Sequence, residues 1–528
     1  MAIQTMLLNA ICRAEKMDNN LSPPEITASN VLDVVRVLRE NSLRHEQLLD
    51  QLMACLQQTE SPRLGWLPHV DSTTVTEPLL TRKIRRVEQH IGSQDILAHL
   101  KGTWIGHFYV NHLKQISLVR WLIIWIWRTL YPFYVNHMAA HFAGKTAKRW
   151  RSLIKLDDYV KTRSVPTIKV LDAVRVETPV PQVFPAVDQE YLSSPHDHYD
   201  FPPIYVAEIS NAMVYGGTNL VFTQDAVICH DLYDFERDYT SEELHGRHLI
   251  DAKKKRMRLL RHDVAPEQIP VAAVFVDACA PNYAHWLTEV LPRIAAFCAE
   301  KQFASIPIIV NDGLHHNIME SLYLITGPER EIITLPVGRE IQVDVLYLTS
   351  VAGYVPFERR NNKLSGHSHG AFSPYAFGEL RNQAALFAEK LPKQEWPEKI
   401  YLRRNSGARK LTNAAELERL LVAKNYVIVE PEKLTFIEQA QLFSRTKVIV
   451  GSSGAAFANI LFAPSNVKIF IIISKYQNTS YWYWQNVACA SGKVLNYIFG
   501  EVDGRGGGIH SGFKIDIEGV IQELGGEL

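Results

Sequence analysis

The spacing of apolar and polar positions changes along the chain, and each change predicts a different kind of structure. Up to about residue 155, apolar positions recur at helical spacing, as in residues 30–39. Between residues 168 and 229, short alternating runs such as 204–209 are separated by turn residues and predict a small β-rich region. From about residue 270, uninterrupted apolar runs alternate with amphipathic stretches, which is typical of α/β domains with buried parallel strands.

Two α/β units follow one another in the second half of the chain. In the first, alternating strands and helices are predicted at residues 271–276, 283–300, 306–310, 318–326, around 332 and at 345–348. In the second, strands are predicted at 399–402, 426–429, 448–450 and 467–473. Helices between these strands begin at Asn413, at Thr435, whose spacing to Glu438 is that of a capping box, and after the turn at 451–454. This βαβα order predicts a doubly wound, Rossmann-like sheet in each unit.

These patterns divide the chain into three parts. We predict a mainly helical region over residues 1–155 that contacts a membrane or a partner, and a β-rich segment plus a first Rossmann-like domain over 156–372. A second Rossmann-like domain with a C-terminal extension is predicted over 373–528. The polar, glycine-containing stretch at 353–371 is either an active-site loop or a linker between the two domains.

The composition narrows the class of protein. Of the 528 residues, 47% are hydrophobic and 21% are charged, which is the composition of a packed globular protein. Lys plus Arg and Asp plus Glu both number 56, so the chain has no basic excess, and we predict no nucleic-acid partner. The six cysteines are scattered without paired spacing, which favours free thiols in a reducing compartment and argues against a zinc site.

The N-terminal part bears on localisation. Residues 1–16 lack the basic start and apolar stretch of a signal peptide, which favours the cytoplasm. The most apolar segment, residues 121–127 between Arg120 and Arg128, is far shorter than the roughly 20 residues that cross a bilayer. It is interpreted either as a buried helix or as an interfacial helix rich in tryptophan that holds the protein peripherally on the inner membrane.

Two groups of residues in the second α/β unit suggest an anion site. Basic residues cluster after the predicted strand at 399–402, namely Arg403, Arg404, Arg409 and Lys410. The turn 451–454, Gly-Ser-Ser-Gly, connects the strand at 448–450 to the next helix, where backbone N–H groups can face a phosphate. Because both groups follow strand carboxyl ends of one sheet, together they fit a diphosphate better than either does alone. Each by itself also fits an ordinary basic loop or turn.

A third group lies in the helix predicted from residue 283. His285, Glu289 and Arg293 are four residues apart and share one helix face. A histidine is a natural general base near neutral pH, and an adjacent carboxylate can orient it and raise its basicity. The alternative is an ordinary surface ion pair on a helix, and Pro292 weakens the geometric argument because it can kink the helix.

At these places the sequence resembles glycosyltransferase family 61, which includes bacterial capsular polysaccharide transferases and plant and animal glycosyltransferases. One motif, Asn-Tyr-x-His-Trp-Leu-x-Glu-x-Leu-Pro-Arg, is matched by residues 282–293. Further matches are Tyr401-Leu-Arg403 with Arg409 and Asn413, the pair Glu438-Gln439, and the element Gly-Ala-x-x-x-Asn-x-x-Phe at 454–462. The resemblance covers roughly residues 200–525. Two departures stand out, because Ser453 occupies a position that is His in many members and the strand at 469–473 ends without an acidic residue.

The resemblance implies a GT-B arrangement of two Rossmann-like domains, inversion at the anomeric carbon, and no catalytic metal or other cofactor. It implies His285 or Glu289 as the catalytic base, with Asn282, Tyr283 and Arg293 on the acceptor side. Taken with the basic loop and the glycine turn, it implies a larger set of donor-binding residues: Arg403, Arg404, Arg409, Lys410, Asn413, Glu438, Ser452, Ser453, Gly454, Ala455 and Asn459.

The sequence therefore predicts a hexosyl- or pentosyltransferase that moves a sugar from a nucleotide-sugar to a hydroxyl of a growing glycan. The setting expected from the resemblance is bacterial capsule or other surface polysaccharide synthesis, with a glycan or lipid-linked glycan as acceptor. Two other classes remain open. One is a nucleotide-sugar epimerase-like enzyme of the same architecture, which would consume donor without an acceptor. The other is a non-catalytic protein of polysaccharide assembly.

Overall fold

The computed structural model describes residues 84–87, 150–192, 197–239, 248–259, 266–358, 370–389, 394–405, 409–475, 482–502 and 511–526. These residues belong to one compact unit, Glu77–Leu528. The prediction of a helical region over 1–155 falls almost wholly outside them, as does the segment 121–127. Where that region is described, it contains strands β1 (Ile84–Arg86) and β2 (Arg151–Lys155), so the helical prediction is wrong at these two places.

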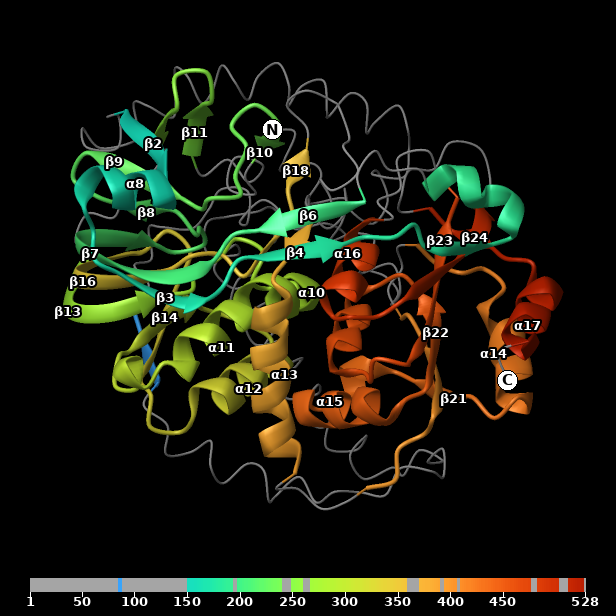
Figure 1. Ribbon diagram of the computed structural model, residues 1–528. Coiled ribbons are helices and arrows are strands. Elements are labelled where there is room, and N and C mark those ends of the chain that lie inside the picture. The colour runs from blue at the N-terminus through green and yellow to red at the C-terminus, as the bar shows by residue number, and fades with distance from the viewer. Residues whose placement is uncertain are drawn as a thin grey trace, which may run out of the picture. The chain divides into compact units, whose positions relative to one another are not determined.

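The first sheet is mixed and contains, within the described residues, twelve strands. Its central strands run parallel in the order β15-β14-β13-β16, with bounds β13 Glu267–Val274, β14 Ile308–Asn311, β15 Ile332–Leu335 and β16 Glu340–Thr349. When these four strands are numbered along the chain, their order in the sheet is 3-2-1-4, which is the order of a doubly wound fold. Antiparallel pairing of β16 with β7 (Ile204–Tyr215) then extends the sheet into the β-rich segment, as Figure 1 shows.

Further strands complete this sheet beyond β7. They are β3 (Thr167–Leu171), β8 (Val221–Phe222), β9 (Ala226–Cys229), β11 (His248–Asp251) and β12 (Arg256–Leu259). Strand β7 runs to Tyr215, so the turn that the sequence predicts over residues 213–217 is confirmed only at Gly216 and Gly217. The strand continues because Met213 and Val214 pair with both β8 and β16, and these ladder hydrogen bonds outweigh the local turn preference.

The helix predicted from residue 283 is present but irregular. It begins as α10 (Tyr283–His285), widens into the π-helical turn η5 (Trp286–Val290), and continues as α11 (Leu291–Ala299). Leu287, Val290 and Ile294 are fully buried, so this face of the helix packs into the core. Two more helices, α12 (His316–Thr326) and α13 (Pro374–Ala388), pack beside α11, and Figure 1 shows the three next to one another.

The second sheet is built on a parallel core in the order β21-β20-β22-β23-β24. The strands are β20 (Lys399–Leu402), β21 (Val427–Val429), β22 (Val448–Ser452), β23 (Lys468–Ser474) and β24 (Leu495–Val502). Two short strands, β5 (Gln182–Phe184) and β25 (Phe513–Lys514), pair with β24. The helices are α14 (Ala414–Ala423), α15 (Phe436–Arg445), α16 (Trp482–Ala490) and α17 (Ile517–Gly526). The α/β class predicted from the sequence is confirmed, whereas the GT-B-like pairing and the domain boundaries stay predictions.

Two predicted helix starts in the second unit differ in the structure. The segment after Gly454 is a 3₁₀-helix, η8 (Ala455–Phe462), instead of an α-helix. Asn413 precedes α14, but its side chain donates to the Ile515 carbonyl oxygen at 2.8 Å and does not cap the helix. The predicted capping box of Thr435 and Glu438 is confirmed at the start of α15.

The two sheets share one apolar core. Phe275, Ile294 and Phe377 from the first half and Phe443 and Ile471 from the second belong to the same cluster of buried side chains. Helix α13 contacts both α11 and α15, and α12 also contacts α15. This packing fixes the carboxyl end of β20 and its neighbours against the segment that begins at Tyr283.

Candidate active site

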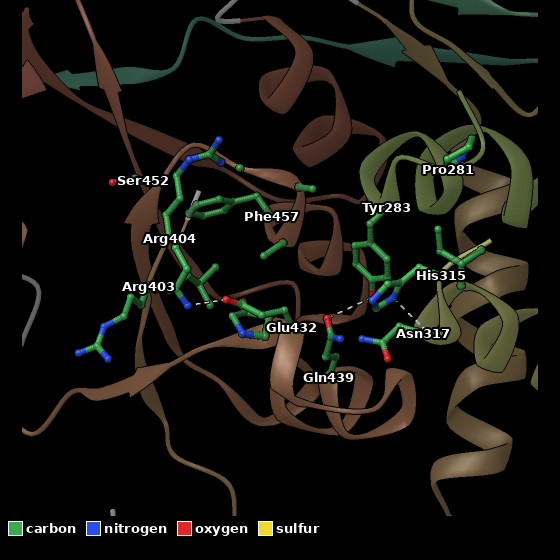
Figure 2. A pocket seen from close by; sticks show the side chains of 17 residues that line it. Pro281, Tyr283, His315, Asn317, Arg403, Arg404, Glu432, Gln439, Ser452 and Phe457 are labelled. Atoms are coloured by element: carbon green, nitrogen blue, oxygen red, sulfur yellow. Dashed lines mark hydrogen bonds between the residues drawn. The ribbon is translucent and has the colours of Figure 1, made fainter. Parts of the chain in front are cut away.

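A pocket of about 440 Å³ lies at the carboxyl ends of strands β20, β21 and β22 of the second sheet. Strand β20 is followed in the chain by β21 on one side of it and then by β22 on its other side, so the loops after these strands leave a crevice between them. Such a switch point at strand carboxyl ends is where open α/β sheets bind ligands. Figure 2 shows the pocket between the loops after β20, β21 and β22 and a wall from the first half of the chain. That wall consists of Pro281, Tyr283, His315, Asn317 and Ile318.

Arg404 lies at the pocket, against the glycine turn. Its Nη1 atom donates a hydrogen bond to the Ser453 carbonyl oxygen at 3.0 Å. A methyl group added to Gly454 would come within 2.4 Å of the same Nη1, so the glycine leaves room for the arginine. Burial, with the nearby charge of Arg409, lowers the pKa of Arg404 to about 10, which still leaves the guanidinium charged at neutral pH.

Arg403 lines the pocket with part of its side chain but directs its guanidinium elsewhere, as Figure 2 shows. It binds Glu418 through Nε (3.0 Å) and Nη2 (2.6 Å), and it binds Glu430 through Nη1 at 2.9 Å. These hydrogen bonds to two carboxylates raise the pKa of Arg403. Arg403 therefore ties β20 to α14 and β21, and Arg404 is the arginine brought to the glycine turn.

The turn itself supplies Ser452, Gly454 and Ala455 to the pocket lining. Gly454 is extended, with φ of −170°, and η8 begins at the next residue. Ser453 is not among the lining residues: it is buried, and its Oγ accepts a hydrogen bond from Trp484 Nε1 at 3.0 Å. Ser453, which occupies a position that is His in many family members, thus bonds to Trp484 and does not face the pocket.

An acidic residue that sequence reasoning missed lies on the β21 side of the pocket. Glu432 follows Glu430 and Pro431 at the carboxyl end of β21, and it is exposed within the lining. Its Oε1 accepts a hydrogen bond from Asn405 Nδ2 at 2.5 Å, which Figure 2 draws as a dashed line. Asn405 follows Arg404 on the loop after β20, so the pair connects the loops of two neighbouring strands.

Polar side chains join the first half of the chain to the second beside this pocket. The Tyr283 hydroxyl contacts Gln439 Oε1 at 3.2 Å and Asn459 Oδ1 at 2.9 Å, and Asn459 Nδ2 donates to Gln439 Oε1 at 2.7 Å. On α12, Asn317 Nδ2 donates to the Leu434 carbonyl oxygen at 3.0 Å. Glu320 Oε2 accepts from the Phe436 N–H at 2.9 Å and so caps α15 from the other unit.

The His285–Glu289 pair lies two residues beyond Tyr283, outside the pocket lining. Nδ1 of His285 is hydrogen-bonded to Glu289 Oε1, while Glu289 Oε2 accepts from the Val355 N–H at 3.2 Å. The two side chains are only 19% and 12% exposed, so the alternative of an ordinary surface ion pair is wrong. The remaining exposure lies on a π-helical turn, an irregularity that recurs at functional sites.

The two groups influence each other's ionisation. Burial alone would lower the pKa of His285, but the Glu289 carboxylate outweighs it and the net shift is upward. Burial raises the pKa of Glu289, and His285 offsets only part of that rise. The pair is suited to accept a proton on His285 near neutral pH, because Glu289 stabilises the imidazolium that forms.

Asp277 and Arg293 extend this cluster. Asp277 follows β13, and its backbone N–H and carbonyl are both held by the Asn311 side chain, at 2.9 and 2.8 Å. Arg293 is 95% buried, with its guanidinium carbon 5.4 Å from the Phe275 ring centroid. Burial lowers the pKa of Arg293, partly offset by the charges of Asp277 and Glu289. Arg293 thus lies inside the protein behind Glu289, as a counter-charge.

Other predicted site residues have different positions. Asn282 caps α10 by accepting from the Ala284 N–H, and Glu438 is occupied by its capping box. Arg409, Lys410 and Asn413 are not among the residues that line the pocket. Lys410 is exposed, and burial lowers the pKa of Arg409.

Sequence reasoning missed several residues at these sites, among them Asp277, His315, Asn317 and Glu432. Asp277 and Glu432 each follow a strand of a parallel sheet, and this position in the sequence could have indicated them as site residues. His315 and Asn317 begin a helix that follows β14, and only the packing of α12 against α15 brings them to the pocket.

Two features of the described part of the chain concern metal binding and membrane crossing. There, no group of three or more His, Cys, Asp or Glu side chains is arranged to hold a metal ion. Among the helices that the structure describes, none has both the length and the apolar character needed to cross a bilayer.

The chain is an α/β protein with a pocket at the switch point of a parallel sheet. Residues 283–470 match the family model described as Glycosyltransferase 61, so the resemblance predicted from the sequence is confirmed over this segment. The match begins at Tyr283, includes all three pocket-lining loops of the second sheet, and ends in β23. The match supports a glycosyltransferase. No curated protein matches the chain.

Proposed function

We propose that the protein transfers a sugar from a nucleotide-sugar to a hydroxyl group of a growing glycan, with inversion and without a catalytic metal. The observation that carries this proposal is the pocket at the β20–β22 switch point, where Arg404 lies against the Gly454 turn. An arginine and the N–H groups of such a turn offset the charge that develops on a diphosphate leaving group. A donor diphosphate held there would point its sugar toward the wall that contains Tyr283.

The reaction we propose is a single displacement. His285 takes the proton of the acceptor hydroxyl, and the acceptor oxygen attacks the anomeric carbon from the face opposite the leaving group. The bond between that carbon and the diphosphate oxygen breaks, and the nucleoside diphosphate leaves with the electron pair. Glu289 stabilises the imidazolium, and its direct action as the base is the second possibility. Approach from the opposite face makes the product inverted.

Of the basic residues that the sequence suggests for the diphosphate, we propose that Arg404 binds it. The guanidinium of Arg403 is already bound to Glu418 and Glu430 and is directed away from the pocket. We propose that Ser452 and Ala455 contact the donor beside Arg404, and that Asn459 acts through Tyr283 and Gln439.

The biological setting rests on the resemblance to capsular polysaccharide transferases. We propose a cytoplasmic enzyme of surface polysaccharide synthesis that acts on a glycan or lipid-linked glycan at the inner membrane. The membrane part is tested with the full chain by fractionation after replacing Trp121, Trp125 and Trp127 by Ser. Loss of membrane association with unchanged melting temperature would support it, and unchanged association would refute it.

The first test of the activity is a screen of the purified protein against a panel of nucleotide-sugars, with released nucleotide as readout. We expect one donor to react, release to accelerate with an acceptor glycan, and the rate to be unchanged by a metal chelator. NMR of the product would give the anomeric configuration. Conversion of donor without any acceptor would favour an epimerase-like enzyme. No binding of any nucleotide-sugar by folded protein would favour a non-catalytic role in assembly.

A further inference from the structure

The polar groups of the pocket are arranged with opposite character in two places. Arg404 and the Gly454 turn present a cation and N–H groups on the loops after β20 and β22. Glu432 presents a carboxylate on the loop after β21. Figure 2 shows Arg404 and Glu432 on the strand side of the pocket, with Tyr283, Gln439 and Asn317 across from them. A bound molecule must therefore be anionic at one place and rich in hydroxyl donors at another.

The carboxylate cannot hold the phosphate part of a ligand. Two like charges in a site of reduced dielectric repel each other, so a diphosphate is directed toward Arg404 and away from Glu432. A carboxylate is an acceptor with about four lone-pair sites, and hydroxyl groups are the natural donors for it. The Asn405 hydrogen bond at 2.5 Å engages one side of the Oε1 atom and thereby orients the carboxylate without exhausting its acceptor capacity.

The position of Glu432 in the sheet also points to a ribose. In doubly wound nucleotide-binding folds, phosphates lie at the turn after one strand, and an acid at the end of the neighbouring strand accepts from ribose hydroxyls. Here β21 is the neighbour of β20, and the chain passes Glu430 and Pro431 before it reaches Glu432. Glu430 is held by Arg403 and Lys433, which leaves Glu432 as the acid of this strand end that lines the pocket.

From these observations we infer that Glu432, oriented by Asn405, accepts hydrogen bonds from the ribose 2′- and 3′-hydroxyls of the donor nucleotide. The pair thereby restricts the enzyme to ribonucleotide donors. This inference rests on the proposed use of a nucleotide-sugar. The family pattern would suggest an acid at the end of the strand at 469–473, and this chain has none there. The inference assigns the ribose contact to Glu432 instead.

The test compares nucleoside diphosphates with their 2′-deoxy counterparts, which carry no glycosyl group and so isolate the nucleotide contacts. Uridine, guanosine, cytidine and adenosine diphosphates are titrated into the full chain by calorimetry. We expect at least one ribonucleotide to bind about 10- to 100-fold more tightly than its 2′-deoxy form, the range for a hydrogen bond to a charged group. In Glu432→Ala, the ratio should fall to less than about threefold.

Three further variants separate recognition from damage to the loops. Asn405→Ala, which keeps the carboxylate but frees it, should give an intermediate ratio. Glu432→Gln should also be intermediate, because an amide oxygen accepts more weakly than a carboxylate. Glu523→Gln, a neutralised exposed acid on α17, should leave the ratio unchanged. A merely structural role of Glu432 would weaken ribo- and deoxyribonucleotides equally and leave the ratio of the wild type.

The outcomes distinguish this inference from the proposed function. A wild-type protein that binds a diphosphate without ribose preference, or a preference that survives in Glu432→Ala, would overturn the role of Glu432 while the glycosyltransferase proposal stands. Folded protein that binds no nucleoside diphosphate and no nucleotide-sugar would overturn both. Thermal unfolding of every variant establishes that a lost preference comes from folded protein.

Discussion

The Tyr283 hydroxyl lies 2.9 Å from Asn459 Oδ1, although the two residues are 176 positions apart in the chain. Gln439 completes the arrangement by accepting from Asn459 Nδ2 at 2.7 Å. Tyr283 begins the first helix of the first unit, and the other two residues come from α15 and η8 of the second. All three belong to the segments in which the chain resembles its family, so part of that pattern holds the two α/β units together beside the pocket.

Removing the Tyr283 hydroxyl tests the strength of this connection. Tyr283→Phe leaves the Asn459 oxygen without this donor in a buried position, which should lower the free energy of unfolding by about 1–2 kcal/mol. Chemical denaturation measures the change. Tyr375→Phe on the exposed side of α13 is the matched control and should change stability by less than about 0.5 kcal/mol. Equal effects of the two substitutions would show that the bridge does not stabilise the protein.

The His285–Glu289 pair predicts a specific dependence of activity on pH. A general base must be neutral, so the rate rises with pH through the pKa of His285, which Glu289 raises above its ordinary 6.5. In Glu289→Gln the charge that raises this pKa is gone and burial lowers it. The acid limb of the kcat/KM profile should therefore move to lower pH, together with a reduced maximum rate.

The same series distinguishes the two candidate bases. His285→Ala should reduce kcat about 10²- to 10⁴-fold if His285 takes the proton. If Glu289 takes the proton, Glu289→Gln should instead abolish activity at all pH values and show no shifted limb. Glu329→Gln, at an exposed position outside the site, is the control and should keep the wild-type profile. Near-normal turnover of His285→Ala would refute the assignment of His285.

Arg404 and Arg403 should respond differently to truncation. Arg404→Ala removes the cation at the glycine turn and should weaken binding of a nucleoside diphosphate about 10- to 100-fold in calorimetry. Arg403→Ala should change that affinity by less than about threefold. It should lower stability by no more than about 1 kcal/mol, since the Arg403 side chain is 35% exposed and water screens its pairs with Glu418 and Glu430. The reverse ranking of affinities would place the phosphates near Arg403.

Two glycines of the same turn should also behave differently. A methyl group at Gly454 meets the mobile end of Arg404 at 2.4 Å, and the extended backbone there suits any residue. Gly454→Ala should therefore weaken nucleotide binding about tenfold with little loss of stability. At Gly451 the methyl group would lie 2.9 Å from the Leu402 carbonyl oxygen, inside the sheet, so Gly451→Ala should destabilise the protein by about 1–3 kcal/mol. Thermal unfolding and calorimetry on both variants separate these outcomes.

Much of the fold could be predicted because it depends on local pattern. The strands β20, β22 and β23 are continuous apolar runs, and such runs between amphipathic stretches read as buried parallel strands. The capping box of α15 is a local hydrogen-bond pattern and was predicted correctly. The turn predicted over residues 213–217 begins only at Gly216, because residues 213–215 pair with β16, more than a hundred residues away in the chain.

The His285–Glu289 contact also follows from local geometry, because side chains four residues apart meet on a helix. The burial of the two side chains does not follow from their spacing. This burial distinguishes the pair from a surface ion pair. The roles of Arg403 and Arg404 were not separable in the sequence. Neighbouring residues at a strand end point to opposite sides of the sheet, and only the position of the sheet decides which side faces the pocket.

The sequence by itself determined the α/β class, the family and the segments that carry the candidate chemistry, since these depend on periodicity and short motifs. The tertiary structure alone decided that Arg404 meets the glycine turn, that Glu432 lines the pocket, and that Tyr283 reaches Asn459. Each of these contacts joins segments separated by dozens of residues or more. Their geometry is set by how the strands are ordered in the sheet and how the helices pack on it, which no local pattern specifies.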